Sequence, residues 1–147
     1  MDDLPLDAPL LSRSLDETDR LAARFYRMIR PDAVVALVGP LGAGKTSFVR
    51  GVAKAAGIDP DNVGSPSFTL INEYPGGETP LFHFDLYRLK SPTEFAAIGG
   101  DDYLNRSGIV LIEWAENGEG YIPDKRFDVR FEIMDERTRR LTFSRRQ

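Results

Sequence analysis

The 147-residue sequence contains no cysteine, one histidine and one tryptophan. The absence of cysteine excludes a disulfide-bonded scaffold and a metal site built from thiolates. No apolar run approaches the roughly 18 residues that a membrane-spanning helix needs. The acidic N-terminus, residues 1–5, lacks the basic and then apolar layout of a signal peptide. We therefore expect a cytoplasmic protein that does not enter a membrane.

The formal net charge is −4, so the chain has no overall basic surface of the kind that nucleic-acid-binding domains present. Arginines nevertheless gather near the C-terminal end, at Arg137, Arg139, Arg140, Arg145 and Arg146. A solvated edge strand protected by charge is the simpler interpretation, and a contact with a partner, RNA or a nucleotide is the alternative. The size and the hydrophobic fraction of 41% predict a single domain over residues 1–147, with residues 1–9 as a flexible extension.

Residues 39–46 are the most informative segment, because GPLGAGKT is a complete G-x-x-x-x-G-K-[ST] loop. An apolar run over residues 33–38 precedes the loop, and residues 47–56 after it predict a helix. A strand, a glycine loop and a helix N-terminus in this order form a cradle for anions, since backbone N–H groups and the helix dipole attract negative charge. Lys45 would reach the β- and γ-phosphates, and the Thr46 hydroxyl would bind Mg²⁺. We therefore expect a site for a nucleoside triphosphate and Mg²⁺.

A P-loop site also needs an acid at the end of a neighbouring strand, which holds Mg²⁺ or its water shell. Glu113 follows the apolar residues 109–112, as a Walker B acid does. Asp85 interrupts an otherwise aromatic and aliphatic stretch over residues 81–89, where an unpaired carboxylate would be costly. The alternatives are a solvent-facing strand end for Glu113, and for Asp85 a structural acid bonded to backbone donors or to Arg88.

The single histidine and the single tryptophan lie beside these acids in the sequence. His83 comes two residues before Asp85 and so lies on the same face of a strand. We interpret it as a packed or surface residue, and Trp114 as part of the core, because large aromatic side chains are usually buried.

The hydrophobic pattern predicts an α/β fold, a P-loop NTPase-like three-layer sandwich with a mixed, largely parallel central sheet and antiparallel edge strands. A capping box formed by Ser14 and Glu17 opens a helix that Pro31 ends. Two more helices are expected, from the P-loop to Gly57 and over residues 92–98, where Gly99 and Gly100 stop the second. Strands are expected over residues 33–38, 68–71, 81–89, 109–114, 127–133 and 141–143, with a hairpin turn over residues 75–78.

Taken together, the motifs resemble the TsaE family, the small P-loop ATPases of bacterial tRNA threonylcarbamoyladenosine synthesis. The P-loop alone names no family, but HFDLYRL followed by IEWAE is specific. The matching segments, in the order of the family, are LGAGKT (41–46), SPSFTL (65–70), HFDLYRL (83–89), GGDDYL (99–104) and IEWAE (112–116). The resemblance extends over about residues 14–143.

The resemblance implies a role for each matching position. The residues that would wrap the phosphates are Leu41, Gly42, Ala43, Gly44, Lys45 and Thr46. Thr46 and Glu113 would be the magnesium residues, and Asp85 the acid that faces the nucleotide, so that Lys45, Asp85 and Glu113 form the catalytic set. A switch-like loop near the γ-phosphate would include Ser65, Ser67 and Thr69. The rest of the nucleotide would be contacted by Glu17, Glu116 and Arg137.

Three positions depart from the family pattern. Pro40 stands where the family usually has an acid, Ser67 stands where it has threonine, and Ala115 stands where proline is frequent. Pro40 removes one backbone donor from the entrance of the loop. The later amides, 42–46, do most of the phosphate contact, so we expect the cradle to survive.

The activity that the resemblance implies is ATP hydrolysis, with low intrinsic turnover that rises when the protein docks on a TsaB–TsaD heterodimer. Hydrolysis would reset the tRNA modification complex, and any contact with tRNA would be indirect. Two other interpretations remain open: a small-molecule or nucleotide kinase, which needs an acceptor pocket and usually a lid, and a nucleotide-gated docking module with negligible turnover. A GTPase is less favoured, because the sequence has no [NT]-K-x-D motif for reading guanine.

Overall fold

The computed structural model describes residues 4–66 and 69–147. Its strands are β1 (Leu10–Ser12), β2 (Ala33–Val38), β3 (Ile71–Tyr74), β4 (Leu81–Asp85), β5 (Ile109–Glu113), β6 (Arg126–Ile133) and β7 (Arg139–Arg146). They form one sheet in the order β1-β7-β6-β2-β5-β4-β3. The four central strands β6, β2, β5 and β4 pair in parallel, whereas β3 at one edge and β7 and β1 at the other pair antiparallel. The expected mixed sheet with antiparallel edges is confirmed.

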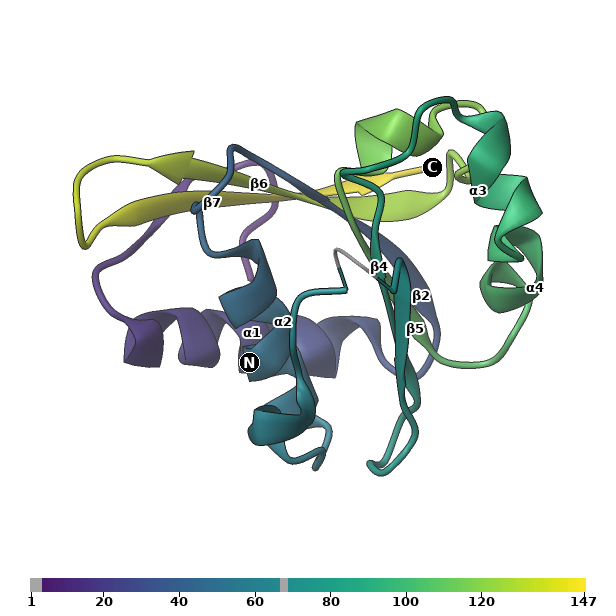
Figure 1. The fold of residues 1–147 in the computed structure, drawn as a ribbon. Helices are drawn as coiled ribbons and strands as arrows, with labels where there is room; N and C mark the ends of the chain where they lie inside the picture. Colours follow the sequence, from purple (N-terminus) through teal and green to yellow (C-terminus); the bar gives the residue numbers. More distant parts are fainter. Residues whose placement is uncertain (1–3, 67–68) are drawn as a thin grey trace.

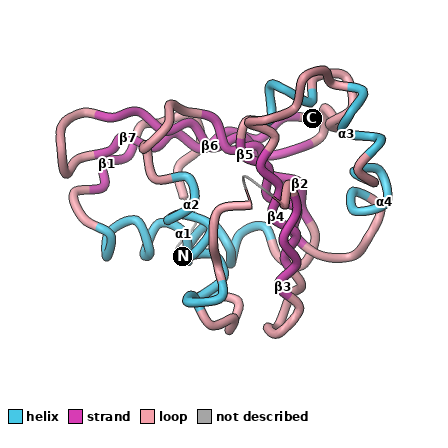
Figure 2. The backbone as a smooth tube through the Cα atoms, viewed as in Figure 1, coloured by secondary structure: helices cyan, strands magenta, loops and turns pink. Residues whose placement is uncertain are grey.

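Helices cover both faces of this sheet (Figure 1). The long helices α1 (Leu15–Ile29) and α2 (Lys45–Ala55) lie on one face, and the short helices α3 (Thr93–Ala97) and α4 (Gly100–Leu104) lie on the other. The remaining turns of helix are the 3₁₀ segments η1 (Pro60–Asn62) and η2 (Ala115–Gly118), and much of the rest of the chain is loop (Figure 2). The three predicted layers are therefore present. Within the described residues, no helix combines the length and the apolar character needed to cross a lipid bilayer.

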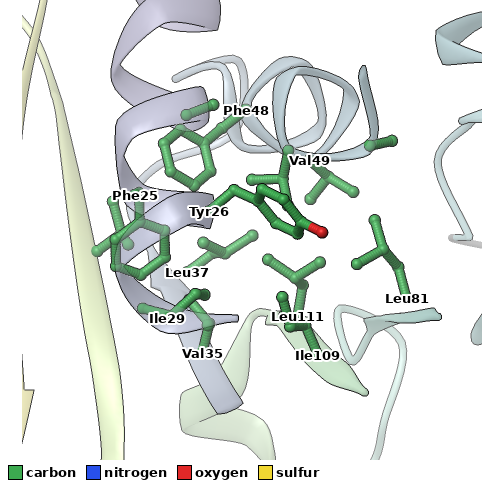
Figure 3. Close-up of a cluster of buried hydrophobic side chains, with 14 of the residues drawn as sticks. Phe25, Tyr26, Ile29, Val35, Leu37, Phe48, Val49, Leu81, Ile109 and Leu111 are labelled. Atoms are coloured by element: carbon green, nitrogen blue, oxygen red, sulfur yellow. The ribbon is translucent and has the colours of Figure 1, made fainter. Parts of the chain in front are cut away.

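The larger hydrophobic core lies between the sheet and the helices α1 and α2 (Figure 3). Strand β2 sends Val35 and Leu37 into this core, while Ala36 belongs to the smaller core on the other face, as the two-residue period of a strand requires. The ring of Phe25 on α1 lies 5.8 Å from that of Phe48 on α2, measured between centroids. Both rings are fully buried. This packing fixes α2, and with it the end of the P-loop, against the sheet.

A glycine allows α1 and α2 to approach closely. A Cβ atom added to Gly51 of α2 would lie 2.8 Å from Cβ of Ala22 and 3.2 Å from Cα of Asp19, both on α1. Overpacking of this kind typically costs about 1–3 kcal/mol, which exceeds the roughly 1 kcal/mol that alanine gains over glycine in helix propensity. We therefore expect Gly51→Ala to lower the free energy of unfolding by on the order of 1 kcal/mol, measured by urea denaturation.

The matched control for this change is Gly76→Ala in the β3–β4 turn, where an added Cβ would have no heavy atom within 4 Å. This variant should unfold at the same urea concentration as the wild type. A Gly51→Ala protein as stable as the wild type would show that the two helices can separate without cost.

Several predicted strands have different bounds in the structure. The differences are one residue for β5 and β6, whereas β7 runs over Arg139–Arg146 where 141–143 was expected. The expected strand over residues 68–71 is wrong in position, because β3 begins only at Ile71; residues 67 and 68 lie outside the described residues. The expected strand over residues 81–89 ends early, at Asp85. The Asp85 carboxylate accepts a hydrogen bond from the backbone N–H of Tyr87 at 2.9 Å. A side-chain bond to the backbone two residues ahead makes a turn, and this stops the strand.

The other differences lie at the edges of the fold. Strand β1 and helix α4 were not predicted, because both are short; α3 does end before Gly99, as expected, but α4 begins directly afterwards. Residues 1–9 were expected to be a flexible extension. Leu4, however, is buried in the core, and the Asp7 N–H donates to the Phe143 carbonyl at 2.7 Å. The described part of this segment is therefore held in place. Burial of the apolar Leu4 side chain is favourable, and the backbone of Asp7 is bonded to β7.

Candidate nucleotide-binding site

The candidate site lies where the carboxyl ends of the central parallel strands meet. Glu113, the last residue of β5, is in register with Leu37 of β2 on one side and with Asp85 of β4 on the other. The loop that follows β2 crosses this edge and enters α2 at Lys45. Both predicted acids and the P-loop are therefore brought to the same edge of the sheet, which is where ligands bind in open α/β folds.

The P-loop backbone has the conformation of an anion cradle. Gly42 and Gly44 have φ angles of +81° and +98°, in the left-handed region that favours glycine. Gly39 is needed for a different reason, since an added Cβ would lie 2.7 Å from the backbone oxygen of Phe131. The first N–H groups of α2, which begins at Lys45, have no acceptor within the helix. They are donors for an anion, and the helix dipole adds to their attraction.

Glu113 is at the centre of a small buried network of hydrogen bonds. Its Oε2 atom accepts a hydrogen bond from the Thr46 hydroxyl at 2.9 Å and lies 2.6 Å from Nε2 of His83. The residue is only 4% exposed, so the interpretation of Glu113 as a solvent-facing strand end is wrong. His83 is fully buried and bonded to this acid, so of the two alternatives, a packed or a surface histidine, the structure has the packed one.

The Thr46 hydroxyl and the Glu113 carboxylate are oxygen donors of the type, and in the small number, with which proteins bind Mg²⁺. Mg²⁺ prefers oxygen ligands, keeps several waters, and is usually bound through one or two protein oxygens together with phosphate oxygens. Thr46 and Glu113 supply such a pair at the N-terminus of α2. The described part of the chain contains no cluster of three or more histidine, cysteine, aspartate or glutamate residues that could enclose a metal by itself. The donor set therefore fits a metal shared with a bound phosphate chain.

Lys45 is buried beside these groups, with only 4% of its surface exposed. Its ammonium donates to the Gly39 carbonyl at 2.6 Å and lies 3.8 Å from the centroid of the Trp114 ring. Burial lowers the pKa of Lys45, and the negative charges of Glu113, Glu116 and Asp85 partly oppose this shift. Trp114 is partly buried against the smaller core, as predicted, but its ring also forms one wall around the lysine.

A hollow joins these residues into one site. Asp85 is 4% exposed and lies beside Glu113 in it. The lining residues are Leu41, Gly42, Gly44, Lys45, Thr46, Ser47, Ser65, Asp85, Tyr87, Arg88, Glu113 and Trp114. The structure thus brings together most of the predicted phosphate-binding residues, the two predicted magnesium ligands Thr46 and Glu113, and Ser65 of the predicted switch-like loop.

The Asp85 carboxylate can be tested with little change in volume. In Asp85→Asn the amide oxygen can still accept from the Tyr87 N–H, so we expect an unchanged melting temperature. If the negative charge acts on the nucleotide or its attacking water, turnover should fall by about a hundredfold or more. The measurements are ATP turnover across a range of Mg²⁺ concentrations and thermal unfolding. Normal turnover with a normal magnesium requirement would make Asp85 a structural acid.

The P-loop separates this hollow from a second one, which contains Arg137. Its other lining residues include Ser14 at the start of α1, Ala43 of the loop, and Arg139. Glu17 lies nearby but has a structural role: its carboxylate accepts from the Arg13 N–H at 3.1 Å, and its own N–H donates to the Ser14 hydroxyl at 3.1 Å. The Ser14 half of the predicted capping box is therefore formed. The Glu17 carboxylate, however, bonds to the N–H of Arg13, one residue before the cap, and not to that of Ser14.

Glu116 and Thr69 are not among the residues that line the P-loop hollow. Glu116, in η2, lines a different hollow, although its charge reaches Lys45. The Thr69 hydroxyl donates to the Asn72 side chain at 2.9 Å, so it helps to order the segment before β3. Ser67 lies outside the described residues. The nucleotide-contacting roles of these residues stay predictions.

Comparison with known proteins agrees with this geometry. The family model described as threonylcarbamoyl adenosine biosynthesis protein TsaE matches residues 12–141. The chain belongs to the TsaE family. The tRNA threonylcarbamoyladenosine biosynthesis protein TsaE of Bacillus subtilis is 37% identical over 129 residues, which are 88% of this chain and 80% of that protein. The protein of the same name from Treponema pallidum is 36% identical over 132 residues, or 90% and 96% of the two chains.

A solved relative shares the fold. The crystal structure of YdiB from Bacillus subtilis superposes on this TsaE-family chain with a TM-score of 0.78 and 31% sequence identity, and the match covers 95% of this chain and 86% of YdiB. The resemblance that the motifs indicated is confirmed, and so is the P-loop-like α/β fold.

The sequence did not reveal three contacts of the TsaE-family site. Arg139 donates to the Gly42 carbonyl at 3.3 Å, so the C-terminal arginine cluster reaches the P-loop. His83 contacts Glu113 through Nε2, and its Nδ1 lies 3.1 Å from the Tyr74 hydroxyl. The sequence did contain one indication that His83 lies near the site: it is two residues from Asp85, on the same face of the strand. The pairing with Glu113 depends on the register between strands, which the sequence does not display.

Proposed function

We propose that this TsaE-family protein binds ATP with Mg²⁺ at its P-loop and hydrolyses it in the biosynthesis of N6-threonylcarbamoyladenosine at position 37 of tRNA. The observation that carries the proposal is the Thr46–Glu113 hydrogen bond of 2.9 Å at the N-terminus of the helix that follows a complete P-loop. The names of the relatives from Bacillus subtilis and Treponema pallidum support the pathway.

Each part of the site has a task in this proposal. The backbone amides of residues 42–46 bind the phosphates, and the Lys45 ammonium exchanges its bond with the Gly39 carbonyl for phosphate oxygens. Thr46 and Glu113 would hold Mg²⁺, which would supply positive charge to neutralise the charge of the phosphates. Asp85, one strand away from Glu113, orients the attacking water. The hollow beside Ser14 and Arg137 accommodates the nucleoside.

The partner that we propose is a TsaB–TsaD heterodimer, with tRNA contacted only through it. Hydrolysis by the isolated protein should be slow, because efficient P-loop enzymes commonly need an additional cation, often from a partner, to stabilise the charge of the transition state. Docking would supply or position that cation, and hydrolysis would then reset the modification complex.

A phosphate-release assay tests the proposal directly. Purified protein is incubated with ATP and Mg²⁺, alone and with the purified TsaB–TsaD pair, and the Lys45→Ala protein serves as the control for contaminating ATPases. We expect slow release alone and an increase of about tenfold or more with the pair, as a partner-supplied cation would give. Binding of ATP without release would instead indicate a docking module, and transfer of phosphate to an added acceptor would indicate a kinase. No heat of ATP–Mg²⁺ binding in calorimetry, with or without the pair, would overturn the proposal.

A further inference from the structure

A line of buried polar side chains runs from the candidate magnesium site into the protein. His83 is fully buried, and Tyr74 and Glu113 are about as inaccessible, at 5% and 4% exposure. Nε2 of His83 lies 2.6 Å from the Glu113 carboxylate, Nδ1 lies 3.1 Å from the Tyr74 hydroxyl, and that hydroxyl lies 3.3 Å from the Gly64 carbonyl. The Tyr74 hydroxyl has one hydrogen, which it can donate to Nδ1 of His83 or to the Gly64 carbonyl, but not to both. Donated to the histidine, it joins Glu113, His83 and Tyr74 into a continuous chain of hydrogen bonds.

The far end of the chain orders the segment that leads into β3. The Asn72 side-chain amide donates to the Tyr74 hydroxyl and to the Gly64 carbonyl, each at 3.4 Å, and its oxygen accepts from Thr69 at 2.9 Å. Asn72 is also directly opposite His83 in the β3–β4 register. Gly64, Thr69 and Asn72 are thus tied to the same tyrosine that contacts the histidine.

The chemistry of these groups fixes the orientation of the imidazole ring. An ionised carboxylate only accepts hydrogen bonds, so Nε2 carries the hydrogen that it shares with Glu113. In the neutral ring Nδ1 is then an acceptor, and the Tyr74 hydroxyl can donate to it. With both nitrogens engaged and no exposed surface, the ring cannot turn without leaving a buried polar group unpaired, which typically costs about 1–3 kcal/mol.

From this geometry we propose that His83 is a positioning residue. It holds the Glu113 carboxylate beside Thr46, and through Tyr74 it couples that carboxylate to Gly64, Thr69 and Asn72. The inference rests on the proposed function, since it assigns His83 to the magnesium site. Partners behind a metal-binding carboxylate fix its orientation, and their loss typically reduces metal affinity about 10–100-fold. A displacement of Glu113 would reach Asn72 through the side chains of His83 and Tyr74, both of which are buried.

Two substitutions of the histidine separate its two contacts. His83→Gln places an amide near the position of Nε2 and keeps a donor for Glu113, whereas His83→Asn reaches only the position of Nδ1 and keeps the contact with Tyr74. The readout is the Mg²⁺ concentration needed for half-maximal ADP binding in calorimetry. We expect this concentration to rise about tenfold in His83→Asn and to stay close to the wild-type value in His83→Gln.

A third substitution cuts the chain beyond the histidine. Tyr74→Phe removes the hydroxyl but leaves the His83–Glu113 contact, so ADP–Mg²⁺ should bind with normal affinity. The readout is hydrogen exchange of the amides of residues 69–74, with and without ADP–Mg²⁺. We expect the wild type to show a change in exchange on binding and Tyr74→Phe to lose it. Tyr26→Phe is the matched control: it removes a buried hydroxyl bonded to Thr79 at 2.9 Å, away from the site, and should retain the change.

The outcomes distinguish this inference from the function on which it rests. A wild-type protein that binds no ADP–Mg²⁺ would overturn both. If the wild type binds but His83→Asn has a wild-type Mg²⁺ requirement, or if His83→Gln is impaired as severely as His83→Asn, His83 does not position Glu113. If Tyr74→Phe retains the exchange response, the coupling to the segment is absent. Should a histidine variant fail to fold, as judged by circular dichroism, the Tyr74→Phe comparison still decides the coupling.

Discussion

Replacing Lys45 with alanine should abolish ATP hydrolysis and weaken ATP binding by about tenfold to a hundredfold. Hydrogen bonds to charged groups contribute about 1.5–3 kcal/mol, and each 1.4 kcal/mol changes an affinity about tenfold. The loss of turnover should be larger than the loss of binding, because charge on the transferred phosphoryl group must be stabilised in the transition state. Phosphate release and isothermal calorimetry measure the two effects separately.

The Lys45→Ala substitution should not reduce the stability of the fold substantially. Burial lowers the pKa of Lys45, so folding disfavours the protonated side chain. For a lysine with a lowered folded-state pKa, the free energy of unfolding increases as the pH rises from that pKa towards the unfolded value of about 10.4. Lys45→Ala removes this cost together with the bond to the Gly39 carbonyl and the contact with Trp114, so its melting temperature at pH 7 should stay close to that of the wild type.

Lys54 provides a matched control on the same helix. Its ammonium lies 3.8 Å from the Asp19 carboxylate, and its side chain is 65% exposed, so it has no access to the P-loop hollow. Lys54→Ala should hydrolyse ATP as the wild type does. Turnover that persists in Lys45→Ala at the level of Lys54→Ala would mean that the P-loop of this protein does not act on phosphate.

The features that the sequence predicts well are those encoded by neighbouring residues. The P-loop, the N-cap at Ser14 and the apolar runs of β2 and β5 each depend on side chains within a few positions of one another. The loop also requires glycine at fixed places, as the positive φ angles of Gly42 and Gly44 show. Because these requirements concern neighbouring residues, they can be recognised in the sequence without knowledge of the fold.

The features that the sequence does not predict depend on residues far apart in the chain. The hydrogen bond of Glu113 to His83 spans 30 positions, and that of Arg139 to Gly42 spans 97. Neither has a local signature, because each follows from strand order and register. Strand ends are also decided by single contacts, as when the Asp85 side chain turns the backbone where the apolar pattern continues. The last strand is also longer than the apolar stretch over residues 141–143, because backbone pairing with β6 continues through the polar residues on both sides of that stretch.

The buried position of Glu113 gives the second large prediction. Glu113→Gln should bind ATP in EDTA nearly as well as the wild type, because the phosphate contacts of the P-loop remain. Mg²⁺-dependent turnover should fall by about a hundredfold or more, a loss comparable to removing one group that stabilises transition-state charge. The glutamine oxygen can still accept from Thr46 or His83, so the fold is kept. The neutral amide, however, is a poor ligand for a hard cation or its water shell. The measurements are ATP affinity in EDTA and in Mg²⁺, and turnover in Mg²⁺.

Glu132→Gln is the appropriate comparison. Glu132 lies on β6 and is paired with Arg140 at 2.8 Å, with 40% of its side chain exposed, and it lines neither hollow of the site, so its loss removes an equal charge outside them. A surface pair of this kind contributes little to stability, and turnover should be unaffected. If Glu113→Gln turns over with the same rate and the same response to Mg²⁺ as Glu132→Gln, the carboxylate does not hold the metal. The Thr46–Glu113 bond would then serve only to fix α2 against β5.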